Sequence, residues 1–106
     1  MNMSQLTTID AIAQHAGRFF RGKPIRKAYL FGSMARREDA AGSDVDILVE
    51  LDSSQTIGLI EYIKWMDDLQ ELLQRKVDLV AEDGLSRHLK PVIDRGKILI
   101  YEVNTF

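Results

Sequence analysis

The sequence predicts an α+β fold, or a layered α/β fold, in which helices cover a small β-sheet. Two observations favour this class: helical and strand-like segments alternate along the whole chain, and no internal repeat or linker divides it. The chain has 106 residues, which is close to the size of one domain. We therefore expect residues 1–106 to form a single domain, and we favour a layered sheet over a helical bundle or a β-sandwich.

The first half of the chain is predicted to form a helix, a strand, a short helix and a second strand. Apolar side chains recur at helical spacing over residues 5–20, and Ser4 is the expected N-terminal cap. Residues 25–31 (IRKAYLF) indicate a strand, and a short helix should follow Ser33. Residues 44–51 (DVDILVEL) then indicate the second strand.

The second half of the chain continues the alternation of helices and strands. We expect a helix over residues 57–75, a strand over 76–81, a helix over 85–95 and a strand over 97–102. Pro91 falls inside the last of these helices, where it would remove one backbone donor and clash with the preceding turn. That helix should therefore start late or kink near His88–Lys90.

The helix predicted over residues 57–75 carries a wide apolar stripe. At about 100° per residue, its apolar side chains between residues 59 and 73 occupy about 180° of the circumference, whereas a surface helix needs about 100°. We favour the interpretation that this helix lies deep in the domain. In the alternative, part of the stripe contacts another protein chain, with Trp65 as an exposed member.

The composition excludes several kinds of protein. Because the chain has no cysteine, it has no disulfide scaffold, no thiol nucleophile and no Cys-ligated metal centre. The N-terminus lacks the pattern of a signal peptide, and no apolar stretch reaches 18 residues. We expect a cytoplasmic protein that binds neither a membrane nor, directly, a nucleic acid.

The net charge of -2 is distributed unevenly along the chain. Residues 1–37 carry seven basic side chains and one acidic side chain, whereas residues 38–106 carry seven basic and fifteen acidic side chains. Such a division could place a cation-rich patch beside an anion-rich patch, which suits a phosphate ligand bridged by metal ions. Solvated surface charge is the alternative explanation.

Asp44 and Asp46 begin the second predicted strand and share one of its faces. Because side chains alternate along a strand, these two carboxylates point to one side while the apolar residues between and after them point to the other. Their Cα atoms would be about 6.6 Å apart, since each residue rises about 3.3 Å. Two carboxylates at this distance repel each other unless cations lie between them, and magnesium prefers such oxygen ligands.

Asp78 repeats this pattern inside the short apolar strand over residues 76–81. A carboxylate there is costly to bury unless it is paired or bound to a metal. If this strand lies beside the second strand, Asp78 can join Asp44 and Asp46 in a cage that holds two metal ions. Taken singly, Asp44 could be a turn residue and Asp78 a strand-edge acid, but together with Gly32-Ser33 they favour a metal site.

Gly32 and Ser33 follow a strand and open a helix, which is a favourable place for an anion. Glycine allows a phosphate to approach the backbone, and the Ser33 hydroxyl can donate a hydrogen bond to it. Arg36, one helical turn further on, could reach the same anion. The alternative is an ordinary turn capped by serine, and the sequence contains neither a P-loop nor a Rossmann motif.

These residues together resemble the nucleotidyltransferase motif of the DNA polymerase beta superfamily. The resemblance consists of Gly32-Ser33, about ten intervening residues, Asp44-Val45-Asp46 between hydrophobic residues, and a later Asp78 in a strand. The short chain and its FGSMAR segment are similar to the minimal, single-domain MNT branch, over about residues 25–102. The resemblance implies the nucleotidyltransferase fold, a small mixed β-sheet packed by helices.

The resemblance also implies a role for each residue of the phosphate segment. Gly32 and Ser33 would hold the β- and γ-phosphates of ATP, and Arg36 would be the arginine of the family's GSxARG motif. Arg37 stands where the family usually has glycine, so the backbone conformation at that position is open.

The three acids receive their roles from the same resemblance. Asp44 and Asp46 would bind two magnesium ions. Asp78 would be the third metal-binding acid and would assist deprotonation of the acceptor hydroxyl.

The resemblance further implies a protein partner. Many MNT proteins form complexes with a HEPN-domain protein, and in such pairs the MNT member is the antitoxin. This chain would then transfer AMP from ATP to a tyrosine hydroxyl of a HEPN ribonuclease toxin, as part of a hetero-oligomer or a homo-oligomer. The alternatives are a non-catalytic module that blocks a toxin sterically and a nucleotidyltransferase that acts on a small molecule.

Overall fold

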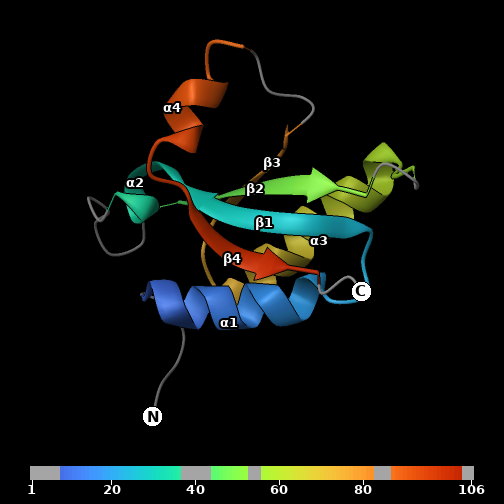
Figure 1. Ribbon diagram of the computed structural model, residues 1–106. Helices are drawn as coiled ribbons and strands as arrows, with labels where there is room; N and C mark the ends of the chain where they lie inside the picture. The colour runs from blue at the N-terminus through green and yellow to red at the C-terminus, as the bar shows by residue number, and fades with distance from the viewer. Residues whose placement is uncertain (1–7, 37–43, 53–55, 83–86, 104–106) are drawn as a thin grey trace.

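A four-stranded mixed β-sheet forms the centre of the structure, with strand order β3-β2-β1-β4 (Figure 1). The computed structural model describes residues 8–36, 44–52, 56–82 and 87–103. The strands are β1 (Ile25–Phe31), β2 (Val45–Leu51), β3 (Val77–Ala81) and β4 (Ile98–Glu102). Strand β1 is antiparallel to both β2 and β4, whereas β2 and β3 are parallel. The predicted fold class is therefore confirmed, and each strand lies within one residue of its predicted bounds.

Helices cover both faces of this sheet. The helices are α1 (Ile9–Phe20), α2 (Gly32–Ala35), α3 (Leu59–Leu73) and α4 (Lys90–Asp94). Helices α1 and α3 pack on one face and contact each other, and α4 lies over the opposite face (Figure 1). None of the helices among the described residues has the length and apolar character needed to cross a membrane.

Helices α1, α3 and α4 begin later than the predicted ranges, and the difference is larger for α1 and α4. The Thr8 side chain accepts a hydrogen bond of 3.1 Å from the Ala11 N–H, so α1 starts at Ile9 and Thr8 caps it instead of Ser4. The helix predicted over 85–95 spans Lys90–Asp94, with Pro91 in its first turn, where no intrahelical donor is lost. The late start expected from the proline is therefore confirmed.

The apolar core fills the space between the sheet and the helices α1 and α3. Its β2 members alternate as expected, since Val45, Ile47 and Val49 are fully buried. Leu48 is also fully buried, although it lies on the other face of β2. Helix α4 lies over that face (Figure 1), and β2 therefore has buried apolar residues on both of its faces.

Helix α3 does not lie as deep as its wide apolar stripe predicts. Trp65 and Leu69 are buried in the core, whereas Leu59, Ile63 and Leu72 are exposed by 72, 44 and 41%. Trp65 is only 5% exposed, so it is a core residue as the favoured interpretation expects, and the alternative is wrong in naming it as an exposed member of the stripe. Hydrophobic periodicity identifies the apolar side chains but not how much of the stripe the neighbouring elements cover. Contact of the exposed part with another chain stays a prediction.

Truncation of two leucines on α3 should show that the buried part of the stripe contributes more to stability than the exposed part. Leu69→Ala should lower the free energy of unfolding by about 2–5 kcal/mol, because it leaves a cavity between the helix and the sheet. Leu72→Ala on the same helix should cost less than about 1 kcal/mol, since that side chain is partly in solvent already. Urea unfolding of both variants measures this, and equal losses would contradict the described packing.

Candidate active site

Three neighbouring strands bring Phe31, Asp46 and Asp78 into one row across the sheet. Phe31 at the end of β1 pairs with Asp46, and Asp46 pairs with Asp78 in the parallel register of β2 and β3. Side chains at paired positions share a face of the sheet, and Asp44, two residues before Asp46, belongs to the same face. The strand order on which the placement of Asp78 depends is therefore confirmed.

The backbone at Gly32 leaves room for the Asp46 carboxylate. Gly32 has a φ of +74°, and a Cβ atom on it would lie 2.2 Å from Oδ2 of Asp46. Any other residue would therefore combine left-handed backbone strain with a direct clash. Because Gly32 both ends β1 and opens α2, the phosphate segment and the acidic row are in contact at this point.

The rest of the predicted phosphate segment follows directly on α2. Ser33 is the second residue of this single-turn helix, and Arg36 lies at its C-terminal end with an exposed side chain. Their position after a strand and at a helix start agrees with the sequence interpretation. Arg37 lies outside the described residues.

Electrostatic repulsion concentrates on Asp46. Burial raises the pKa of its carboxyl, the negative charges of Asp78 and Asp44 raise it further, and the Arg36 guanidinium partly opposes them. Asp46 is half-buried, whereas Asp44 and Asp78 are exposed. A cation placed among these carboxylates would remove the repulsion that raises the pKa.

The three carboxylates provide the donor chemistry of a magnesium site but do not form a closed cage. Within the part of the chain that the structure describes, no three acidic or histidine side chains are grouped so that they could hold a metal ion. Magnesium usually binds through one or two carboxylates together with water and substrate phosphates. The half-buried and repelled Asp46 fits such a ligand, and the complete ligand set predicted from Asp44, Asp46 and Asp78 stays a prediction.

Two further residues support this site and were not predicted from the sequence to do so. The Tyr62 hydroxyl on α3 donates a hydrogen bond to the Leu79 carbonyl, next to Asp78, and burial followed by the Asp78 charge raises the tyrosine pKa. Arg75 is 5% exposed and places its Nη1 4.0 Å from Sδ of Met34, the buried residue of α2. The spacing of Tyr62 indicated a core face, but which strand it meets depends on the tertiary structure.

Comparison with known proteins places the chain in a family. The family model described as polymerase beta nucleotidyltransferase matches residues 14–105. A relative from Methanocaldococcus jannaschii, provisionally named a protein adenylyltransferase, is 30% identical over 100 residues, which are 92% of this chain and 100% of the relative. The chain therefore belongs to the polymerase beta nucleotidyltransferase family, and it is a nucleotidyltransferase.

Several solved structures share this fold, including two that come from toxin–antitoxin pairs. The first is a toxin–antitoxin structure with AMP-PNP, which has a TM-score of 0.74 at 22% identity over 87% of this chain and 74% of that chain. The second is a tri-AMPylated HEPN toxin from Shewanella oneidensis in complex with an MNT antitoxin. Its TM-score is 0.68 at 21% identity, over 88% of this chain and 71% of that chain. At these identities the likeness concerns the fold.

Replacement of two glycines should distinguish backbone strain from the contact with Asp46. Gly22 has a φ of +85° and no atom near the position of a Cβ, so Gly22→Ala should cost about 1–2 kcal/mol of stability and leave activity intact. Gly32→Ala carries the same strain and also displaces the Asp46 carboxylate, so nucleotidyl transfer should fall about a hundredfold. Unfolding and transfer assays measure both effects, and equal activity of the two variants would contradict the role of this contact.

The raised pKa of Asp46 predicts a pH-dependent gain in stability for Asp46→Asn. Folding raises the pKa of this carboxyl above its ordinary value of 3.8, so ionising it costs more in the folded state than in the unfolded state. The folded state therefore loses stability as the pH rises above that ordinary pKa. The neutral amide lacks this penalty, so the variant should be more stable than the wild type at pH 7, and the difference should shrink toward pH 4. Urea midpoints in EDTA measure it, with the exposed Asp67→Asn as control, and a less stable Asp46→Asn protein at pH 7 would refute the explanation.

Proposed function

We propose that this nucleotidyltransferase is a magnesium-dependent antitoxin that transfers AMP from ATP to a tyrosine hydroxyl of a HEPN ribonuclease toxin. The observation that carries the proposal is the row of Asp46 and Asp78 across two parallel strands, in contact with Gly32 at the start of α2. The name of the M. jannaschii relative and the AMPylated HEPN toxin bound to an MNT antitoxin support a protein as the acceptor.

The phosphate segment would hold the triphosphate of ATP. Gly32 exposes its backbone at the site, Ser33 would donate its hydroxyl to a phosphate oxygen, and Arg36 would neutralise phosphate charge. Asp44 and Asp46 would hold two magnesium ions, which supply charge neutralisation for the phosphates. This transfer requires positioning and charge neutralisation more than a protein nucleophile.

Asp78 would serve as the acid that receives the acceptor proton. The acceptor oxygen forms a bond to the α-phosphorus of ATP while the bond from that phosphorus to the bridging oxygen breaks, and pyrophosphate leaves. The hydroxyl proton passes to the Asp78 carboxylate. An exposed carboxylate on an edge strand is accessible to a hydroxyl that belongs to another protein.

A labelling experiment should test the proposal. The protein is incubated with α-labelled ATP, magnesium and the product of the adjacent gene, and the wild type should label that partner. Asp44→Ala with Asp46→Ala should lower the labelling rate more than about a hundredfold, since loss of groups that support metal ligands already costs 10–100-fold. Removal of magnesium by EDTA should abolish labelling.

Matched variants separate catalysis from binding. Asp67→Ala with Asp68→Ala removes two exposed acids from α3 and should leave labelling unchanged. If wild-type protein labels neither chain, the transferase proposal is wrong. If the Asp44 and Asp46 variant still neutralises the partner as well as the wild type does, steric blocking replaces catalysis as the mechanism.

A further inference from the structure

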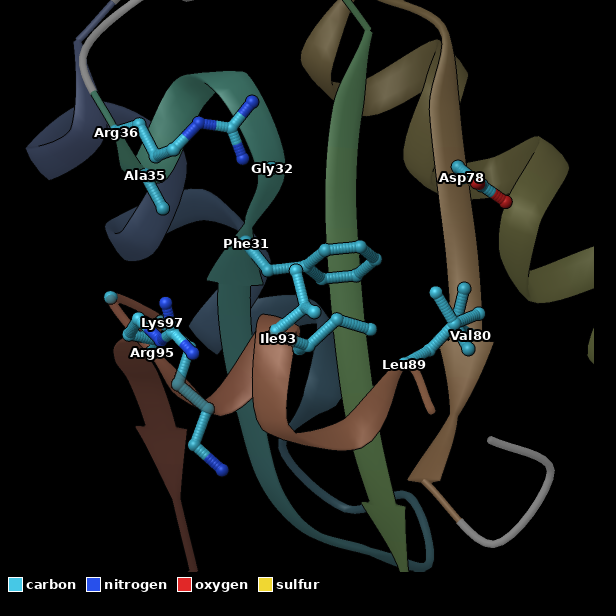
Figure 2. A pocket seen from close by; sticks show the side chains of 12 residues that line it. Phe31, Gly32, Ala35, Arg36, Asp78, Val80, Leu89, Ile93, Arg95 and Lys97 are labelled. Carbon is cyan, nitrogen blue, oxygen red and sulfur yellow. The ribbon is translucent and has the colours of Figure 1, made fainter. Parts of the chain in front are cut away.

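A cavity of about 330 Å³ opens beside the acidic row, on the face of the sheet that α4 covers (Figure 2). The start of α2, strand β3, helix α4 and the turn before β4 surround it. Figure 2 shows Phe31 and Ile93 between two groups of side chains, with Arg36, Arg95 and Lys97 on one side. This cavity, here called the α4 pocket, is of the size at which small-molecule sites begin.

The wall of the α4 pocket is largely apolar. Phe31 at the end of β1, Val80 on β3 and Ile93 on α4 line it. Two further apolar side chains, one at the N-cap of α4 and one inside it, line the pocket while they remain open to solvent. They are Leu89, exposed by 53%, and Val92, exposed by 60%. Apolar surface that lines a concave site in this way is typical of a surface that a ligand covers.

The charges around the α4 pocket favour an anionic ligand. Three basic side chains and one acidic side chain line it. Lys97 is held in place by a 2.8 Å contact from its Nζ to Oδ1 of Asp94 and lies 4.1 Å from the centre of the Tyr29 ring. The pocket also includes Gly32 and Arg36, so it is continuous with the proposed phosphate site.

We propose that the α4 pocket holds the nucleoside part of the nucleotide whose phosphates lie at Gly32, an inference that rests on the proposed function. An aromatic base would pack against Phe31 and Ile93, and its burial would cover Val92. Gly32 and Arg36 line the pocket themselves, so a group attached to phosphates held there enters it directly, and this continuity favours the nucleoside over the phenol ring of an acceptor tyrosine. The pocket therefore assigns to α4 a part in recognition of the nucleotide.

A substitution that fills the pocket tests this inference. Val92→Trp places an indole into the pocket from an exposed position, and Leu89→Trp does the same from the residue that precedes α4. Each should lower the affinity for Mg-ATP about tenfold or more, because the base loses its place, and should leave the affinity for Mg-tripolyphosphate unchanged within twofold. The control Ile63→Trp, on α3 across the sheet, should change neither affinity.

Isothermal titration of each folded variant with both ligands distinguishes the outcomes. Unchanged ATP affinity in both pocket variants overturns the inference and leaves the proposed function intact. Unchanged ATP affinity with loss of partner labelling also overturns it, because the pocket then serves the acceptor. If wild-type protein binds neither Mg-ATP nor Mg-tripolyphosphate, the proposed function itself is wrong. A selective loss of ATP affinity supports the inference.

Discussion

The parallel register of β2 and β3 is the constraint on which the site depends. The register pairs Val45 with Val77 and Ile47 with Leu79, and all four of these side chains are buried in the core. A shift of β3 by one residue against β2 would turn Val77 and Leu79 toward the opposite face of the sheet. The hydrophobic core therefore keeps Asp46 beside Asp78, and the chemistry of the site is a consequence of packing on the other face.

The same register places electrostatic repulsion on Asp46. Asp46 is half-buried and receives negative potential from two other aspartates, while the Arg36 charge opposes this only in part. Gly32 brings its backbone against the carboxylate and contributes no side chain that could shield it. A bound cation would offset the negative charge of the aspartates, and a bound phosphate would offset the positive charge of Arg36. The stability of this region is therefore linked to occupation of the site.

Local sequence patterns predicted the strands well, because the alternation of apolar and polar residues indicates which side chains share a face of the sheet. They predicted IRKAYLF as β1 and placed the β2 aspartates opposite the buried Val45 and Ile47. They did not predict that Leu59 and Leu72 on α3 are exposed, because exposure depends on which elements cover the helix. They also did not predict that Thr8 caps α1, because several polar residues precede that helix. The α4 pocket also depends on tertiary structure, since its walls come from segments far apart in the chain.

The topology also defines where an acceptor can reach the site. Helices α1 and α3 pack against the core face of the sheet, so the acidic row is open toward α4 and toward the edge of β3. If the nucleoside occupies the α4 pocket, the acceptor hydroxyl would reach the acidic row from the edge of β3, where Asp78 is exposed. At that edge the Tyr62 hydroxyl binds the Leu79 carbonyl and so holds α3 against the strand that carries Asp78. The two substrates would thus approach the acidic row from different sides, which suits a reaction in which one of them is part of another protein.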